Sequence, residues 1–297
     1  MSIKNSYSIK DLENLTGVKA HTIRIWEKRY ELLEPMRSET NIRNYNEKSL
    51  LKLLNIALLN ENGVKVSKIA KLSENEIYLK VRELVVEKEH PLHAINDFKV
   101  AMLNFDRQRF DNTYNQLLAQ SSFRDIFLKV FIKLLEDIGL LWISNTITPA
   151  HEHFISTLIK QKLLINIERV QGVKVKSKKT FVLFLPQNEI HDIGILYIHF
   201  ELLLKGYESV YLGPSVPIAS LLGLQEVFEE IEYVSYFTVE PSINKVEPFL
   251  NEMSKNILSL RKEKLHVLGR NTRELNEANL PINVIAYDDI ISLIGRV

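Results

Sequence analysis

The spacing of hydrophobic and polar residues divides the chain into three regions. In the first, from Tyr7 to about Ile77, short amphipathic stretches are separated by Gly17, Pro35 and Gly63. Glycine and proline interrupt regular structure, so this pattern predicts several short helices. We place the first domain at residues 1–77.

The second region, residues 78–174, follows a helical pattern almost throughout. Apolar residues recur at three- and four-residue spacing, as in the run from Phe98 to Phe105. Breaks occur at Pro91, at residues 121–122 and at residues 146–149. The pattern therefore predicts a four-helix bundle as the second domain.

In the third region, residues 175–297, the apolar pattern changes to that of short strands separated by helical stretches. The β-rich runs are residues 180–185, 209–212, 234–239, 265–268 and 284–287. Strands alternating with helices predict a doubly wound, flavodoxin-like (Rossmann-type) five-stranded parallel sheet. Its ligand would lie beyond the C-terminal ends of the strands. The predicted fold is thus multidomain, with α and α/β parts.

The composition is that of an ordinary globular protein, with 297 residues of which 45% are hydrophobic and 25% charged. The apolar stretches are too short or too interrupted to span a membrane, and the N-terminus lacks the apolar core of a secretory signal. We therefore expect a cytoplasmic protein with no membrane partner. The absence of cysteine excludes thiolate metal sites, disulfides and a cysteine nucleophile. Any metal must be held by His, Asp, Glu or a cofactor's own ring.

The net charge of +1 does not indicate whether the protein binds nucleic acid, but the distribution of charges along the chain is informative. Residues 8–12 predict a helix, Gly17 a tight turn and residues 19–30 a second helix, which is the helix-turn-helix plan. Between residues 18 and 45 there are six basic and four acidic side chains. Basic residues cluster on the second helix, where phosphate contacts would form. A solvated helix face is the alternative that charge alone leaves open.

A longer pattern extends this interpretation. TIRIWE at residues 22–27, RYELLEP at 29–35 and NIRNY at 41–45 closely resemble the MerR family of transcriptional regulators. The resemblance implies a winged helix-turn-helix that binds two half-sites as a dimer, with residues 19–29 as recognition helix and 37–45 as wing. Trp26 is equally compatible with a core position. With the basic side chains of helix and wing, the predicted DNA-binding residues are Lys19, Thr22, Arg24, Trp26, Lys28, Arg29, Arg37, Arg43 and Tyr45.

The first strand of the third region runs into a loop that contains a candidate metal ligand. His191 lies just beyond the strand's C-terminal end, and Glu189 is placed to accept the ring's other N–H. Such a carboxylate would fix the tautomer and raise the basicity of the ring. Gly194 would allow helix and ligand to approach closely. The alternative is a solvent-exposed loop histidine beside an acid.

The motif Glu-x-His-x-x-Gly, followed by YLGPSVP at residues 211–217, resembles cobalamin-binding domains. The resemblance implies that His191 ligates cobalt from the lower face. The chain departs from the family where Tyr236 and Thr238 replace its Ser-x-Leu motif, and where its Gly-Gly pair reads Gly269-Arg270. Both positions line the slot for the cofactor's nucleotide tail, and the large side chains would narrow it. The implied cofactor-binding residues here are Glu189, His191, Gly194, Val216, Tyr236, Thr238, Gly269 and Arg270.

In the helical region, Trp142 is followed nine residues later by Glu152 and His153. Taken alone, these are a core tryptophan and an acid that complements a helix dipole. The spacing resembles cobalamin-dependent light-sensing regulators of the CarH and LitR type, in which these positions cover the upper face of the cofactor and its adenosyl group. Ile143 replaces the histidine that binds cobalt after illumination in the best-known members. A second histidine ligation therefore either does not occur here or uses His151 or His153.

Together these resemblances imply a non-enzymatic, DNA-binding repressor that binds adenosylcobalamin through its cobalt. Its oligomeric state, dimer or tetramer, and its affinity for a double-stranded operator would respond to light. One alternative is a cofactor-free C-terminal domain used for protein contacts, and a lesser one is a corrinoid methyl carrier. A phospho-receiver domain is disfavoured because residues 238–240 lack the aspartate that it needs.

Overall fold

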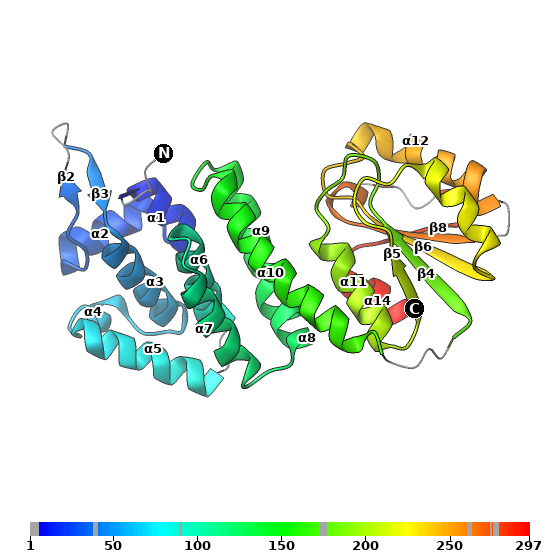
Figure 1. Cartoon of the computed structure of the whole chain (residues 1–297). Helices are drawn as coiled ribbons and strands as arrows, with labels where there is room; N and C mark the ends of the chain where they lie inside the picture. Colours follow the sequence, from blue (N-terminus) through cyan, green and yellow to red (C-terminus); the bar gives the residue numbers. More distant parts are fainter. Residues whose placement is uncertain are drawn as a thin grey trace. The chain divides into compact units, whose positions relative to one another are not determined.

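The computed structural model describes residues 6–37, 41–88, 91–172, 177–259, 263–273, 275 and 279–297. The chain forms two compact units, Met1–Ile159 and Lys160–Val297 (Figure 1). The predicted domain boundary at residues 174–175 lies outside the described residues. No helix within the described ranges combines the length and hydrophobicity that crossing a membrane requires.

The first unit begins with the predicted winged helix-turn-helix. Its elements are β1 (Tyr7–Ser8), α1 (Ile9–Thr16), α2 (Ala20–Tyr30), β2 (Met36–Arg37) and β3 (Arg43–Tyr45). Ser8 and Asp11 form a capping box at the start of α1, and Gly17, with φ of 75°, ends it in the left-handed conformation. β3 pairs antiparallel with both β1 and β2, which makes the wing a short hairpin.

The next elements are α3 (Glu47–Glu61), α4 (Val66–Ile69) and α5 (Glu74–Lys88). Asn46 caps α3 by accepting a hydrogen bond from the Ser49 backbone N–H. The buried residues Leu50 and Leu53 of α3 join Leu12 of α1 and Ile23 of α2 in the apolar core of the domain.

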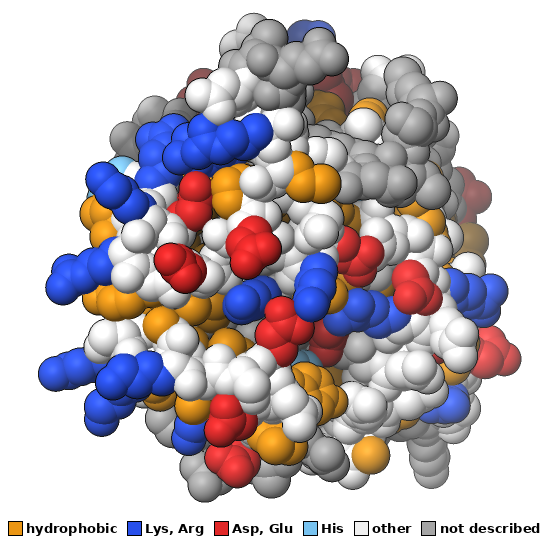
Figure 2. Space-filling view, turned by 90° about the vertical axis from the view of Figure 1, so that its left-hand side faces the viewer, with side chains coloured by type: hydrophobic (Ala, Val, Ile, Leu, Met, Phe, Trp, Pro, Cys, Tyr) orange, Lys and Arg blue, Asp and Glu red, His pale blue; other side chains and the backbone are white. Residues whose placement is uncertain are grey.

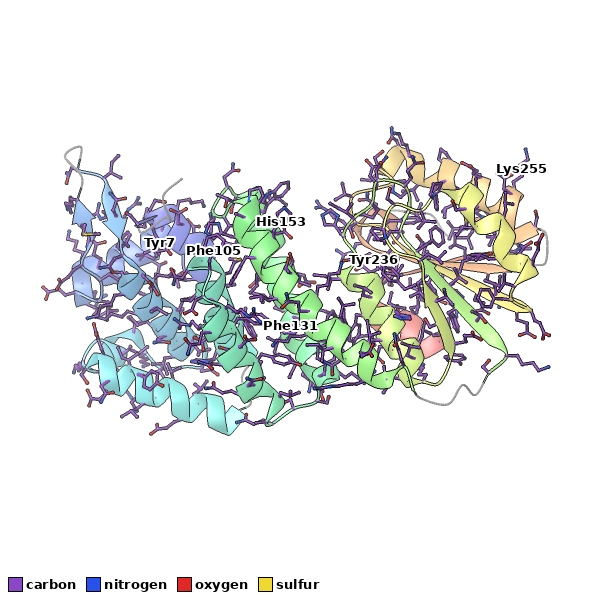
Figure 3. The ribbon with its side chains drawn as sticks, viewed as in Figure 1. Tyr7, Phe105, Phe131, His153, Tyr236 and Lys255 are labelled. Atoms are coloured by element: carbon purple, nitrogen blue, oxygen red, sulfur yellow. The ribbon has the colours of Figure 1, made fainter. Side chains whose placement is uncertain are left out.

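The predicted four-helix bundle follows. Its elements are α6 (Pro91–Leu103), α7 (Arg107–Leu118), α8 (Phe123–Ile126), the π-helical turn η1 (Phe127–Phe131), α9 (Ile132–Ile143) and α10 (Pro149–Val170). α8, η1 and α9 join without a break, since the residues at their junctions keep helical dihedrals. The core is aromatic: Phe98 and Phe110 are buried with ring centroids 4.9 Å apart, and both contact the ring of Phe131 (Figure 3).

One detail of the predicted bundle is wrong. The apolar run that ends at Phe105 was expected to continue one helix, but Phe105 has φ of 52° and lies in a turn between α6 and α7. Asp106 causes this break because its carboxylate accepts a hydrogen bond from the Arg109 backbone N–H at 2.9 Å and caps α7. The Phe105 ring instead stacks on His151, with centroids 4.7 Å apart.

The second unit contains the predicted five-stranded parallel sheet. Its strands are β4 (Lys179–Phe184), β5 (Glu208–Tyr211), β6 (Glu230–Tyr236), β7 (Lys264–Leu268) and β8 (Val284–Tyr287). Their order is β5-β4-β6-β7-β8, with every pairing parallel. This is the flavodoxin-like order, in which the chain reverses its direction of winding between β4 and β6.

Helices cover both faces of the sheet. On one face lie α11 (Ile193–Leu204) and α14 (Ile290–Arg296), and on the other lie the 3₁₀ segment η2 (Ile218–Glu226), α12 (Ile243–Met253) and the π-helical turn η3 (Ser254–Leu258) (Figure 1). A 3₁₀ turn, η4 (Arg270–Thr272), follows β7. The connection between β5 and β6 contains this nine-residue 3₁₀ segment in place of a predicted helical stretch.

The third strand is displaced from its predicted position at residues 234–239, since β6 covers Glu230–Tyr236. At its start, Glu232 is accommodated in the buried sheet by Lys179 and His266, at 2.7 and 2.8 Å. At its end, the backbone N–H groups of residues 238–240 donate to the Glu189 carboxylate instead of continuing the strand. Side-chain partners distant in sequence therefore set both ends of β6.

Candidate functional site

The predicted recognition helix α2 and its N-cap residue Lys19 present basic side chains to solvent. Lys19, Arg24, Lys28 and Arg29 are exposed, as is Arg37 on the wing. Basic side chains project from one edge of the face shown in Figure 2, with acidic ones interspersed nearer its middle. Thr22 is half-buried on the same helix. Basic side chains on one helix and one wing strand of this surface can therefore contact phosphates.

Three of the predicted DNA-binding residues also hold the domain together. Trp26 is only 8% exposed and packs in the core, as its alternative interpretation requires. Tyr45 is fully buried, and its hydroxyl donates to Glu27 at 3.0 Å, while the Arg43 guanidinium pairs with the same carboxylate at 3.0 Å. Burial and the hydrogen bond to Glu27 raise the pKa of the Tyr45 hydroxyl, so it remains a donor. Glu27 therefore fixes the wing against the recognition helix.

In the second unit, Glu189 organises the loop that follows β4. The side chain is fully buried. One carboxylate oxygen accepts from the backbone N–H groups of Ile190 and His191, at 2.8 and 2.9 Å, and lies 2.6 Å from His191 Nδ1. The other oxygen accepts from the backbone N–H groups of residues 238–240, at 2.6 to 3.1 Å. The predicted Glu189–His191 pair is thus formed, and it joins the loops after β4 and β6.

The charge state of Glu189 determines which nitrogen of His191 can bind a metal. Burial acts to raise the pKa of Glu189, but the hydrogen bonds from the His191 ring and the backbone outweigh it and lower the pKa to about 2. An ionised carboxylate only accepts hydrogen bonds, so Nδ1 of His191 carries the proton. In the neutral ring, Nε2 then holds the lone pair that a metal requires.

Asp192 anchors the same loop from its other side. The side chain is 6% exposed, and its Oδ2 pairs with Lys160 Nζ at 2.5 Å and accepts from the Tyr211 hydroxyl at 3.2 Å. His191 lies between these two buried carboxylates, with its own side chain about half exposed. The sequence prediction did not include Asp192, although its position next to the candidate ligand was a usable signal.

The other predicted cofactor-binding positions lie around the same strand ends. Val216 is paired with Pro186 beside β4 and β5, and Thr238 contributes its backbone N–H to Glu189. Gly194, near the start of α11, faces Tyr236, and Gly269 faces the backbone of Phe237. Arg270 is exposed at the start of η4. Gly194 therefore does allow close approach, but the group that approaches it is the Tyr236 ring.

The three candidate residues of the bundle lie on two successive helices. Trp142, 55% exposed, is near the end of α9, which places it at a helix terminus rather than in the core. Glu152 and His153 are in the first turn of α10, where His153 Nδ1 lies 2.9 Å from the Glu152 carboxylate and the His153 side chain is exposed (Figure 3). His151 is instead buried, in contact with Thr148 and stacked on Phe105. Of the two histidines considered for a second cobalt ligand, His153 is the accessible one.

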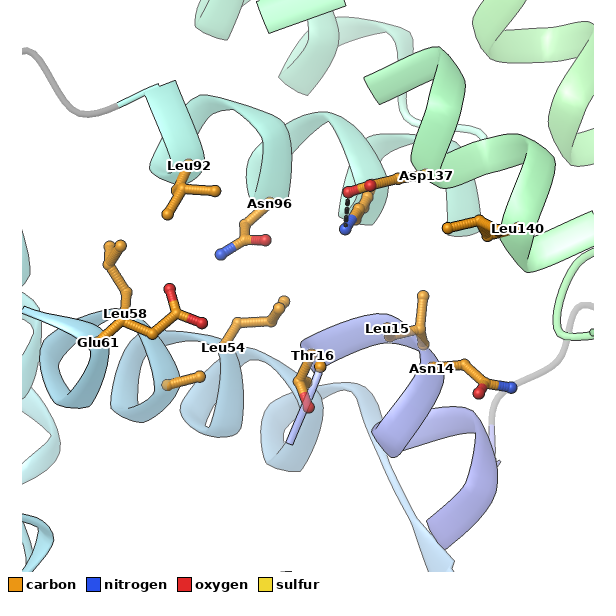
Figure 4. Close-up of a pocket in the computed structure, with 13 residues that line it drawn as sticks. Asn14, Leu15, Thr16, Leu54, Leu58, Glu61, Leu92, Asn96, Asp137 and Leu140 are labelled. Carbon is orange, nitrogen blue, oxygen red and sulfur yellow. Dashed lines mark ion pairs between the residues drawn. The ribbon is translucent and has the colours of Figure 1, made fainter. Parts of the chain in front are cut away.

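The bundle is joined to the winged helix-turn-helix domain by contacts that the sequence did not predict. Asn14 of α1 donates to Thr146, in the loop between α9 and α10, at 2.8 Å, and Asn104 donates to Glu47 at the start of α3 at 2.9 Å. A crevice of about 220 Å³ lies between α1, α3, α6 and α9. Lys99 and Asp137 form an ion pair of 2.7 Å on its wall (Figure 4).

Comparisons with known proteins agree with this arrangement. Residues 7–76 match the MerR HTH family regulatory protein model, which covers the winged helix-turn-helix. Residues 94–165 match a model described as a B12 binding domain, which covers the bundle from α6 to α10. The chain carries a MerR-type helix-turn-helix and a B12-binding domain.

Two relatives of the chain come from Myxococcus xanthus. The chain is 27% identical to the HTH-type transcriptional repressor CarH over 225 residues, which are 73% of this chain and 74% of CarH. It is 25% identical to the repressor CarA over 72% of this chain and 70% of CarA. Among solved structures, the monomethylamine corrinoid protein of Methanosarcina barkeri is similar in fold, with a TM-score of 0.56 at 14% identity. That match covers 70% of this chain and 98% of the other.

The residues around His191 fit a corrinoid by the chemistry of their donors. An imidazole whose Nδ1 is held by an ionised, buried carboxylate is a strong ligand through Nε2. About half of the His191 side-chain surface is exposed to solvent. The position beyond the C-terminal strand ends is where open α/β sheets bind ligands.

Proposed function

We propose that this protein is a cytoplasmic, DNA-binding transcriptional repressor that binds adenosylcobalamin, with His191 as the lower cobalt ligand. Light would control its oligomeric state and its affinity for a double-stranded operator. The observation that carries the proposal is the pairing of His191 with the buried carboxylate of Glu189. The MerR and B12-binding matches and the similarity to the repressors CarH and CarA support it.

In this proposal, α2 and the wing contact the operator. Lys19, Arg24, Lys28, Arg29 and Arg37 would reach phosphates, since their side chains are exposed. Glu27 would keep Arg43 and Tyr45 of the wing in register with the recognition helix. A dimer would read two half-sites of a pseudo-palindrome.

In the same proposal, residues from two segments of the chain would hold the cofactor. Glu189 would hold the Nδ1 proton of His191, which aims the lone pair of Nε2 at cobalt. Trp142, Glu152 and His153 would contact the opposite face of the corrin and its upper ligand. When bound, adenosylcobalamin supplies a light-sensitive cobalt–carbon bond, which is chemistry of the cofactor rather than of the protein.

The contacts between bundle and DNA reader would carry the signal. Thr146 lies in the loop between Trp142 and Glu152, and it accepts the hydrogen bond from Asn14 of α1. A change at the loop would therefore act on α1, which packs against the recognition helix α2. In the proposed function this contact couples cofactor state to DNA affinity.

The experiment is to load the protein with adenosylcobalamin in the dark and to record its absorbance, its mass by light scattering and its affinity for an operator selected from random duplex DNA. Green light should change the absorbance, shift the mass and alter DNA affinity by at least about tenfold, a coupling of about 1.4 kcal/mol. His191→Ala is the control and should take up little cofactor. A loaded protein with identical spectrum, mass and DNA affinity after illumination would contradict light regulation.

A second candidate function is favoured by one observation, which is that the Tyr236 ring packs against Gly194. In the cobalamin-binding domains that this region resembles, the nucleotide tail of the cofactor occupies this place. In this second function, the second unit would bind no cofactor and would serve protein contacts. The two functions differ in a titration with cobalamin. Stoichiometric uptake that His191→Ala abolishes supports the first function, and absence of uptake by a folded, DNA-binding protein supports the second.

A further inference from the structure

The Tyr236 side chain occupies a special position in the sheet. In a parallel sheet of order β5-β4-β6-β7-β8, the connections after β4 and β6 leave towards opposite faces. In folds with this strand order, ligands commonly insert into a crevice between the C-terminal ends of these two strands. Tyr236 is the last residue of β6, and Gly194 is the second residue of α11, which follows β4.

The ring of Tyr236 fills the gap between β6 and α11. Its Cε2 and Cζ atoms lie 2.8 and 2.9 Å from the point where a Cβ on Gly194 would be. Real Cβ atoms do not approach other heavy atoms so closely, so the ring is in direct contact with the glycine backbone. No space for a further chemical group remains between these two residues.

The walls of the crevice are also held together. The Glu189 carboxylate accepts hydrogen bonds from both the loop after β4 and the loop after β6. On the far side of β6, a Cβ on Gly269 would lie 2.4 Å from the carbonyl oxygen of Phe237, and φ of Gly269 is 121°. The backbone beside Tyr236 is thus packed tightly from that side, and widening the crevice would break buried hydrogen bonds.

We propose that Tyr236 closes this crevice to the ligand's tail, so that the site selects corrinoids with little or no nucleotide tail. This inference rests on the proposed function, because it concerns the corrinoid held by His191. A corrin ring held by His191, whose side chain is half exposed beyond the end of β4, would not require insertion between the strands. A nucleotide tail inserted beside α11 would have to displace the Tyr236 ring, and a tail left outside would gain no buried contacts.

The test compares two probes, aquocobinamide, which has the corrin ring without the nucleotide, and aquocobalamin. Each is titrated into the full-length protein and followed by the absorbance change of the corrin on histidine ligation. We expect the wild-type protein to bind cobinamide at least about tenfold more tightly than cobalamin, a difference of about 1.4 kcal/mol. This comparison needs no variant, so a folding defect cannot obscure it.

Variants at position 236 then assign the preference to the ring. Tyr236→Ser should strengthen cobalamin binding about tenfold or more and change cobinamide binding less than about threefold, because only the tail uses the opened space. Tyr236→Phe, which keeps the ring and removes the hydroxyl, is the matched control and should behave as wild type. Thermal unfolding of each variant reports whether it is folded.

The outcomes separate this inference from the proposed function. If wild type binds cobalamin as tightly as cobinamide and Tyr236→Ser changes neither, the closed crevice is wrong while the corrinoid site stands. If neither corrinoid binds to wild type or Tyr236→Ser, and both proteins are folded, the proposed function itself fails. Wild type that prefers cobalamin also overturns the inference.

Discussion

The two segments that carry the candidate cofactor residues are held in different ways. The loop of His191 is fixed by two buried carboxylates, Glu189 and Asp192, whose oxygens accept from several separate parts of the second unit. At the α9–α10 junction, the candidate residues Trp142 and His153 are exposed. In the first segment the candidate ligand His191 is held by a hydrogen bond to a buried carboxylate, whereas in the second the candidate side chains are exposed.

The difference has a structural cause. The ends of parallel strands converge at one edge of a sheet, so a single buried carboxylate there can reach two loops at once. The junction between α9 and α10 is held instead by two buried residues, Thr146 and His151, which contact other parts of the first unit. In the proposed function, His191 would hold the cofactor from a loop fixed by hydrogen bonds, and the exposed residues of the junction would contact the face of the cofactor that changes.

The largest expected effect comes from His191. We predict that His191→Ala weakens adenosylcobalamin binding at least about 100-fold, since removing a metal ligand exceeds the 10–100-fold effect typical of its hydrogen-bond partner. Gln187→Ala, an exposed position in the same loop, should leave binding unchanged. Both would be measured by titration with detection in the visible spectrum. Equal affinity in the two variants would show that the preformed loop is not the binding element.

Glu189→Gln tests whether preorganisation, rather than the histidine alone, gives the affinity. An amide keeps the size but loses charge, and its N–H₂ group cannot accept the backbone hydrogen bonds that one carboxylate oxygen now receives. We expect a 10–100-fold loss of cobalamin affinity and a lower midpoint of thermal unfolding. Glu226→Gln, exposed on η2, is the control for removal of a charge.

The sequence predicted one of the two carboxylate contacts that hold the His191 loop and missed the other. The Glu189–His191 pair was predicted because both residues lie on one short loop and their spacing constrains them. Asp192 was missed because its partners, Lys160 and Tyr211, are distant in the sequence and only the fold brings them together.

The same distinction holds for the fold. Helix ends governed by local residues, such as Ser8 and Asp11 at α1, agree with the prediction. The shifted ends of β6 depend on Lys179, His266 and Glu189, which local periodicity does not report. Phe105 looked helical by spacing, but Asp106 competes as a cap and the Phe105 ring finds a partner in His151.

Trp142→Ala addresses the exposed segment. Because the side chain is largely exposed, we expect its removal to change the free energy of unfolding by no more than about 0.5 kcal/mol. It should weaken binding of adenosylcobalamin about tenfold and binding of hydroxocobalamin by less than about threefold, since only the former carries a large upper ligand for the indole to cover. Leu140→Ala, on the same helix and 65% exposed, is the matched control. Equal losses for both cofactors would mean that Trp142 does not distinguish the upper ligand.

The smallest effect on ligand binding is expected at Glu232, which lies near the start of β6, away from the strand end that faces the His191 loop. Burial acts to raise the pKa of Glu232, but hydrogen bonds from His266 and Lys179 outweigh it and lower the pKa to about 2. A carboxylate whose pKa is lower in the folded than in the unfolded state stabilises the fold at pH values above its unfolded-state pKa, near 4.5. This contribution is lost as the pH falls from 4.5 towards 2. We therefore predict that Glu232→Gln lowers the free energy of unfolding by about 1–3 kcal/mol at pH 7 and that the difference from wild type narrows below about pH 4.5.

Cobalamin affinity of Glu232→Gln at pH 7 should stay within about twofold of wild type, because Glu189 orders the His191 loop locally. Urea unfolding at several pH values and a cobalamin titration at pH 7 provide the two measurements. If Glu232→Gln lost affinity as strongly as Glu189→Gln, the order of the His191 loop would depend on the sheet as a whole. The difference in order between the His191 loop and the α9–α10 junction would then be due to the stability of the second unit and not to the carboxylates that hold the loop.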